Sequence, residues 1–188
     1  MNTYLAWAIA LIAIIGGVYF FGFSNGMGPQ GSGYSQASID RHFIEEMIPH
    51  HEGAIEMAKV ALEKSKRPEV LSLARGIVEA QTKEINDMRT WYKAWFGTEV
   101  PEGGGMMHGM GGGIYMEGAV GDLDRLMAAA DFDQEFLSQM IVHHEMAVMM
   151  GRMLLSGTTR AEMKTLADNI ITSQTREIEM MRSWLRAW

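Results

Sequence analysis

An ungapped internal repeat is the feature of this sequence that most restricts its fold. Residues 40–95 align with residues 133–188 at a constant offset of 93, and 24 of the 56 aligned positions are identical. A match of this length indicates duplication of one structural unit. Within each copy, apolar residues recur at helical spacing on both sides of a short polar break, at 64–68 and at 156–159. Each copy is therefore predicted to form a helical hairpin with one apolar face.

Two such hairpins bury their apolar faces best against each other, which predicts an all-α fold built on a four-helix bundle. We place this bundle at 39–188. The Gly- and Met-rich connection between the repeats, 97–130, contains too much Gly before residue 122 to form a stable helix there, and a short helix is expected around 122–130. Residues 25–38 are rich in Gly and Ser, which is the composition of a flexible linker.

The N-terminal segment is almost wholly apolar from Tyr4 to Phe23, and no charged residue precedes Asp40. About 20 apolar residues in a helix span the hydrocarbon core of a bilayer. The basic start and small-residue cleavage site of a secretory signal peptide are not evident. We therefore predict an uncleaved transmembrane helix within 1–24, in contact with lipid through residues 4–23.

Composition narrows the function. A net charge of −7 argues against a nucleic-acid partner, because phosphate binding needs a basic surface. The chain has no Cys and 18 Met, so it has neither disulfides nor thiolate metal sites. In an oxidising compartment thioethers resist oxidation better than thiols and still bind copper. This favours a single-pass protein of the bacterial cytoplasmic membrane, with its domain facing the periplasm or exterior.

Two histidine pairs at equivalent positions of the repeat are the most distinctive polar residues. They account for four of the six histidines, and they are His50-His51 and His143-His144. At about 100° per residue, the Met three positions before each pair shares a helix face with the first His and with a later Met. The Glu that follows each pair points away from this face, so we expect Glu52 and Glu145 to face solvent or to pair with Arg.

The second helix of each hairpin is expected to add a carboxylate and a thioether, so that each hairpin gathers its own ligands. The candidates are Met47, His50, His51, Met57, Glu84 and Met88 in the first copy, and Met140, His143, His144, Met150, Glu177 and Met181 in the second. Glu84 and Glu177 have two interpretations, as buried acceptors for a His N–H or as carboxylates that orient a ligating His. The histidines themselves have a plainer interpretation as satisfied core residues.

Two further methionine groups stand apart. A stripe at i, i+3, i+4 and i+7, formed by Met146, Met149, Met150 and Met153, is expected to fill the core. In the Gly-rich connection, by contrast, there is no core to fill, and Met106, Met107, His108 and Met110 are candidates for metal capture. Imidazole suits several transition metals, whereas thioether selects soft ions. The expected metal is therefore copper, as Cu(I) or Cu(II).

The strings MIPHHEGAIEMA and MIVHHEMAVMM, with QTKEINDMRTWY and QTREIEMMRSWL, resemble the CopM-like family of Met- and His-rich helical domains, a bacterial family of unknown function. The resemblance covers essentially all of 40–188. It implies a ferritin-like four-helix bundle, an extracytoplasmic setting and copper binding through Met47, His50, His51, Met57 and their equivalents in the second copy. Val142 replaces Pro49 in that copy, so the two sites need not be equivalent.

The sequence thus predicts a membrane-anchored, extracytoplasmic copper-binding protein for metal resistance or delivery, and not an enzyme. The alternative is a structural or accessory subunit of a larger membrane complex of respiratory or photosynthetic electron transport, with vestigial metal sites. The apolar anchor supports this alternative, as do Trp184 and Trp188, which are candidate contact residues for other subunits. A di-metal oxidase is disfavoured because no Glu-x-x-His spacing occurs.

Overall fold

The computed structural model describes residues 36–101 and 121–188 and is all-α over these residues. Four long helices carry the two repeats. They are α1 (Gln36–Lys64) and α2 (Pro68–Phe96) in the first copy, and α4 (Phe132–Gly157) and α5 (Ala161–Ala187) in the second. The short α3 (Leu123–Ala128) precedes α4. The predicted pair of helical hairpins and the short helix between them are confirmed.

Local signals in the sequence set several helix ends. Pro68 occupies the first turn of α2, where its missing N–H is not needed. The same helix ends at Gly97, whose φ of 72° is left-handed and whose N–H donates to the carbonyl of Lys93 at 3.0 Å. At the start of α4, the carboxylate of Asp131 accepts from the N–H of Gln134 at 3.1 Å.

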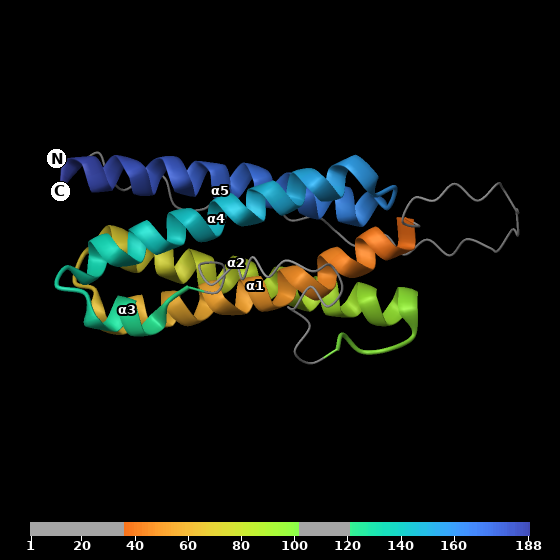
Figure 1. The fold of residues 1–188 in the computed structure, drawn as a ribbon, viewed down its shortest axis with the longest axis horizontal. Helices are drawn as coiled ribbons and strands as arrows, with labels where there is room; N and C mark the ends of the chain where they lie inside the picture. Colours follow the sequence, from red (N-terminus) through yellow and green to blue (C-terminus); the bar gives the residue numbers. More distant parts are fainter. Residues whose placement is uncertain (1–35, 102–120) are drawn as a thin grey trace, which may run out of the picture. The chain divides into compact units, whose positions relative to one another are not determined.

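The two hairpins lie against each other lengthwise (Figure 1). Within them, α1 packs along α2 and α4 packs along α5, and the main contact between the hairpins is made by α1 and α4. Both histidine pairs lie near the middle of these two helices. The duplication therefore brings all four histidines to the interface between the hairpins.

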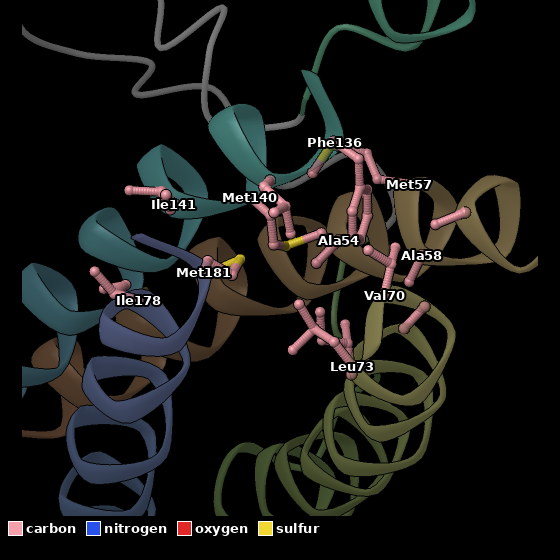
Figure 2. Packing of buried hydrophobic residues seen from close by; sticks show 14 of the residues in the cluster. Ala54, Met57, Ala58, Val70, Leu73, Phe136, Met140, Ile141, Ile178 and Met181 are labelled. Carbon is pink, nitrogen blue, oxygen red and sulfur yellow. The ribbon is translucent and has the colours of Figure 1, made fainter. Parts of the chain in front are cut away.

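Buried residues form two clusters, and the methionines in them come from both hairpins. The first cluster holds Met140 and Met181 of the second copy together with Met57 of the first, as Figure 2 shows. The second holds Met47 and Met88 of the first copy, with Met150 of the second packed against it. The prediction that each hairpin gathers its own ligands is therefore wrong for Met57 and Met150, whereas the other four methionines lie with those of their own copy. Because α1 and α4 pack directly on each other, the later Met of each helix reaches the opposite hairpin.

Two equivalent groups of contacts hold the loop of each hairpin to the ends of the other hairpin. One group is Arg67, Asp133 and Trp188, and the other is Arg160, Asp40 and Trp95. The guanidinium–carboxylate distances are 3.3 and 3.1 Å, and the guanidinium carbons lie 3.7 and 4.1 Å from the indole centroids. All three residue types are identical in the two copies. We call these groups the Arg–Asp–Trp clamps.

The predicted transmembrane helix, residues 25–35 of the predicted linker and most of the connection at 97–130 lie outside the described residues. So do Met106, Met107, His108 and Met110. The last three residues of the predicted linker, 36–38, belong to α1, so the helix begins earlier than predicted. Among the helices that the structure describes, none combines the length and apolar character needed to cross a membrane.

Candidate metal centre

The four paired histidines lie in the core, where the two hairpins meet. His50 is 5 % exposed, and His51, His143 and His144 are fully buried. The rings of His50 and His143, one from each hairpin, approach to 3.7 Å between centroids. Each of them lies 6.3 Å from the ring of its own sequence neighbour. The structure thus joins two pairs, 93 residues apart in sequence, into one cluster of four imidazoles.

Two of these rings are oriented by carboxylates. The Nε2 atom of His51 lies 2.6 Å from a carboxylate oxygen of Glu84, and Nε2 of His144 lies 2.7 Å from Glu177. An ionised carboxylate only accepts, so Nε2 carries the proton and donates it to the carboxylate. In the neutral ring, Nδ1 then keeps a free lone pair. Of the two interpretations of these glutamates, the hydrogen-bond acceptor is what the geometry shows, and a ligating role for the histidines stays a prediction.

A third ring is oriented by backbone. The Nε2 atom of His143 lies 2.8 Å from the carbonyl oxygen of His50, which can only accept. This bond also places the proton on Nε2 and leaves Nδ1 with its lone pair. The equivalent bond from His50 to the second hairpin is not formed: among the described residues, neither ring nitrogen of His50 has a hydrogen-bond partner. The two copies therefore differ at this position.

Unpartnered nitrogens gather in this cluster. The Nδ1 atoms of His50, His51, His143 and His144 are all buried, and none has a hydrogen-bond partner within 36–101 and 121–188. Buried polar atoms in folded proteins nearly always have partners, and exceptions need a physical reason. In three of the four rings, those of His51, His143 and His144, Nε2 donates a hydrogen bond that fixes the ring, so Nδ1 carries an oriented lone pair. That is the geometry of a histidine held ready to donate to a metal ion.

Burial also keeps two of the four rings, those of His50 and His143, neutral. It lowers the pKa of His50 to about 3, with a further contribution from the neighbouring His51 and His144. Burial likewise holds the pKa of His143 well below its ordinary value, and the facing His50 adds to the effect. A protonated imidazole cannot bind a metal, so neutral rings at physiological pH are a condition for a histidine site.

Thioethers are the other soft donors in this core. Met47, Met57, Met88, Met140 and Met181 are fully buried, and Met150 is half-buried. Met47 and Met140 precede the histidine pairs by one helical turn, and Met88 and Met181 follow Glu84 and Glu177 by one turn. Over the described ranges, no group of three or more His, Cys, Asp or Glu side chains is arranged to hold a metal ion. Their role as ligands remains a prediction.

The glutamates next to the histidine pairs lie outside the core, as predicted. Glu52 is exposed and pairs with Arg89 at 2.7 Å. Glu145 is exposed and pairs with Arg182. Each pair links the two helices of one hairpin across its surface.

The prediction that the methionine stripe of α4 fills the core is wrong. Met149 is 45 % exposed and Met153 is 65 % exposed, whereas Met146 and Met150 are half-buried. The buried residues of α4 that come after the histidine pair are Ala147, Val148, Gly151 and Leu154, which lie on the same helix face as the pair. At about 100° per residue, the stripe is turned to the flank of that face. Helical periodicity identified two adjacent apolar faces of α4, one with the histidine pair and one with the methionine stripe. It did not show that only the face with the histidine pair is buried.

Two buried glutamines were not among the predicted site residues. Gln81 and Gln174 are each 3 % exposed, and the side-chain oxygen of each lacks a partner. They precede Glu84 and Glu177 by three residues, on the same helix faces. Their identity in the two copies, at positions that ordinary core packing would fill with apolar residues, is the signal that marks them.

The terminal tryptophans are used within the domain. Trp184 and Trp188 stack on each other, with ring centroids 6.3 Å apart, and both pack against the first buried cluster. Trp188 also lies under the guanidinium group of Arg67. Both keep part of their surface exposed, and their role as contacts for other subunits stays a prediction.

Comparison with known proteins places this geometry in a family. Residues 40–188 match the sequence profile of DUF305, a domain of unknown function. The solved structure of CopM in its Cu(II)-bound form is 48% identical, covers 79% of this chain and 97% of that chain, and superposes with a TM-score of 0.71. The Cu(I)-bound form gives 44% identity, 83% and 99% coverage and a TM-score of 0.68. CopM has also been solved with silver bound.

Among curated proteins, an uncharacterized protein of Acanthamoeba polyphaga mimivirus is 40% identical over 57 residues. The match covers 30% of this chain and 38% of that protein, so the chain spans well under half of the length of this relative. The match supports relatedness of one segment only.

Proposed function

Because the chain belongs to the DUF305 family and is similar to CopM over most of its length, we propose that it binds monovalent copper through its buried histidine cluster. Silver, which shares the charge and softness of Cu(I), is expected to bind in the same way. We further propose that binding serves metal resistance or delivery and that no reaction is catalysed.

The single observation that carries this proposal is the set of buried, unpartnered Nδ1 atoms. His51, His143 and His144 each donate from Nε2 to a fixed acceptor, so their Nδ1 lone pairs are available and oriented. Leaving such atoms unpaired in a core costs about 1–3 kcal/mol each, which a bound metal ion would offset.

The surrounding donors favour a soft ion. Met47 and Met88 are buried in one cluster and Met140 and Met181 in the other, each set within a helical turn of the paired histidines and glutamates. Thioether sulfur prefers Cu(I) and Ag(I) over harder divalent ions. A carboxylate on the far nitrogen of a ligating imidazole also raises its basicity, which strengthens the bond to the metal.

The membrane location belongs to the same proposal. The apolar run at 4–23 is long enough to span a bilayer, and the linker at 25–38 would hold the bundle on the outer side. The supply of Met in the absence of Cys fits an oxidising compartment. A tethered bundle would bind copper at the membrane surface and would not diffuse as a free carrier.

Replacement of the buried histidines tests metal binding. The full-length chain is purified in mild detergent and titrated with Cu(I) against a coloured Cu(I) chelator. We expect His51→Leu combined with His144→Leu to abolish tight binding. His42→Ala is the matched control, because His42 lies on the same helix α1 but is exposed. Unchanged stoichiometry in the double variant would contradict the proposal.

A second measurement covers the case in which the double variant does not fold. X-ray absorption at the copper edge of the loaded wild-type protein reports the ligand atoms directly. Nitrogen together with sulfur scattering supports a site of imidazoles and thioethers. A shell of oxygen alone would contradict it.

A further inference from the structure

One flank of α4 exposes more apolar surface than a solvated helix needs. Val142, Met149 and Met153 are 47 %, 45 % and 65 % exposed, and Met146 and Met150 on the same flank are half-buried. Neighbours three and four residues apart on a helix lie about 5–6 Å apart at Cβ. The four methionine side chains therefore form a continuous row along the helix.

The first copy of the repeat shows that packing does not require this row. The positions equivalent to Met146, Met149 and Met153 are Gly53, Glu56 and Val60. Glu56 is exposed, so a charged side chain is tolerated at the place where α4 has a methionine. Both copies build the same hairpin. The extra thioethers are thus an addition to the second copy that the fold does not explain.

The two copies also differ in how the later methionine is covered. Met57 of α1 is fully buried, and the backbone at Gly121 lies directly over it, since a Cβ built on Gly121 would come within 2.2 Å of the Met57 sulfur. The equivalent Met150 of α4 is half-buried. The later methionine of α1 is therefore covered by the backbone at Gly121, whereas its equivalent on α4 keeps part of its surface exposed.

Exposure falls in steps along the row towards the core. Met153 and Met149 are exposed, Met150 and Met146 are half-buried, and Met150 packs against the cluster that contains the buried Met47. Met146 follows His143 by three residues, about 4.5 Å along the helix axis. Thioethers are thus available at every depth between solvent and the histidine cluster.

We propose that the methionine flank of α4, Met146, Met149, Met150 and Met153, is the entry path by which a monovalent soft cation, Cu(I) or Ag(I), reaches the buried histidines. This inference rests on the proposed function of the cluster. Thioethers bind such ions without carrying charge, so an ion held by two of them exchanges readily to the next pair. Stronger donors, the oriented imidazoles, lie at the inner end.

Transfer kinetics test the path separately from the site. Full-length protein in detergent is mixed with a Cu(I)–chelator complex, and the loss of chelator absorbance gives the rate and the final extent of transfer. Met149→Leu with Met153→Leu removes both exposed sulfurs and nearly conserves volume. The matched control is Met127→Leu on α3, since Met127 is 51 % exposed but lies off the flank.

We expect the Met149/Met153 variant to take up Cu(I) several-fold more slowly, with the same final stoichiometry and affinity, and the control to match wild type. Unchanged kinetics in the variant, with normal loading, would overturn the entry path and leave the proposed function intact. Slower uptake in the control as well would overturn it too, because the effect would not be specific to the flank. Failure of the wild-type protein to bind Cu(I) would refute the proposed function itself.

Discussion

At the scale of the residue, the duplication places identical side chains in unequal surroundings. His143 donates to the backbone of the opposite hairpin, whereas the equivalent His50 has no partner on either ring nitrogen in the part of the chain that the structure describes. Met57 is sealed in the core, whereas Met150 is half-buried. The carboxylates of Glu84 and Glu177, by contrast, orient His51 and His144 in the same way in both copies. The hydrogen-bond partners and the burial of a side chain therefore depend on its neighbours as much as on its residue type.

The carboxylates are expected to strengthen metal binding. Glu84→Gln with Glu177→Gln retains a side-chain acceptor for each ring N–H but removes the negative charge behind the ring. Loss of such a partner lowers metal affinity by about 10–100-fold in other sites. Competition with Cu(I) chelators of graded affinity measures the effect. Equal affinity in the variant would show that the glutamates only fill space and satisfy a donor. Glu52→Gln, at an exposed surface pair, is the control.

Burial of the histidines makes the metal-free fold sensitive to acid. The pKa of His50 is lowered to about 3, whereas a histidine in the unfolded chain takes up a proton near 6.5. The unfolded state therefore binds more protons in this interval, and the free energy of unfolding falls as pH decreases through it. The contribution of the neutral, buried His50 to the free energy of unfolding is fully present above the pKa of histidine in the unfolded chain. Each such histidine contributes a slope of up to about 1.4 kcal/mol per pH unit.

Urea unfolding at several pH values measures this slope. His143, whose pKa is also lowered by burial, adds to it, so His143→Leu is expected to reduce the slope. The exposed His42 supplies the control, because His42→Ala removes a histidine from the same fold without removing a buried one. A free energy of unfolding that does not change with pH between neutral and acid conditions would contradict the prediction.

At the scale of the element, the Arg–Asp–Trp clamps explain how two hairpins of modest size form one core. Each clamp joins the loop of one hairpin to the start of the first helix and the end of the second helix of the other hairpin. The clamps differ in burial, since the carboxylate of Asp40 is 1 % exposed and that of Asp133 is 15 % exposed. This difference leads to unequal consequences when the arginine is removed.

Arg160→Ala is expected to cost more than the equivalent Arg67→Ala. Loss of Arg160 leaves the buried carboxylate of Asp40 without its cation, which destabilises by about 3 kcal/mol when a buried pair is broken. Loss of Arg67 leaves a more solvated carboxylate and also removes the cation–π contact with Trp188, which together are worth about 1 kcal/mol. Arg182→Ala, at an exposed pair within one hairpin, serves as control. Chemical denaturation ranks the three, and equal losses at both clamps would refute the argument.

At the scale of the whole molecule, the proposed role depends on a segment that the described structure does not include. Residues 4–23 have the length and composition of a membrane span, and residues 25–38 those of a linker. A bundle held in this way would bind copper at the membrane surface, and it could contact only proteins and lipids located at that surface.

Charges placed within the apolar segment test the anchor. Leu11→Arg with Ile15→Arg is expected to release the full-length protein from bacterial membranes during alkaline extraction, since each Arg near the bilayer centre costs about 2.5–3.5 kcal/mol. Gln30→Arg with Ser32→Arg adds the same charge in the linker and should leave the protein in the membrane fraction. Retention of the first variant would refute the anchor. Extraction of the native protein in mild detergent distinguishes copper binding from the alternative role as a subunit of a larger membrane complex. Recovery of a stoichiometric complex without metal would favour the subunit role.

The four long helices and their arrangement as two hairpins could be predicted from the amino-acid sequence, because an ungapped repeat with helical periodicity leaves few other ways to bury two apolar faces. The sequence also identified the histidine pairs and the outward direction of Glu52 and Glu145, which follow from helical angles alone. Three features could not be predicted in this way: the placement of Met57 and Met150 in the clusters of the opposite copy, the close approach of His50 to His143, and the exposure of Met149 and Met153. Those features depend on how α1 and α4 pack, and helical periodicity within one helix carries no information about the partner across the interface.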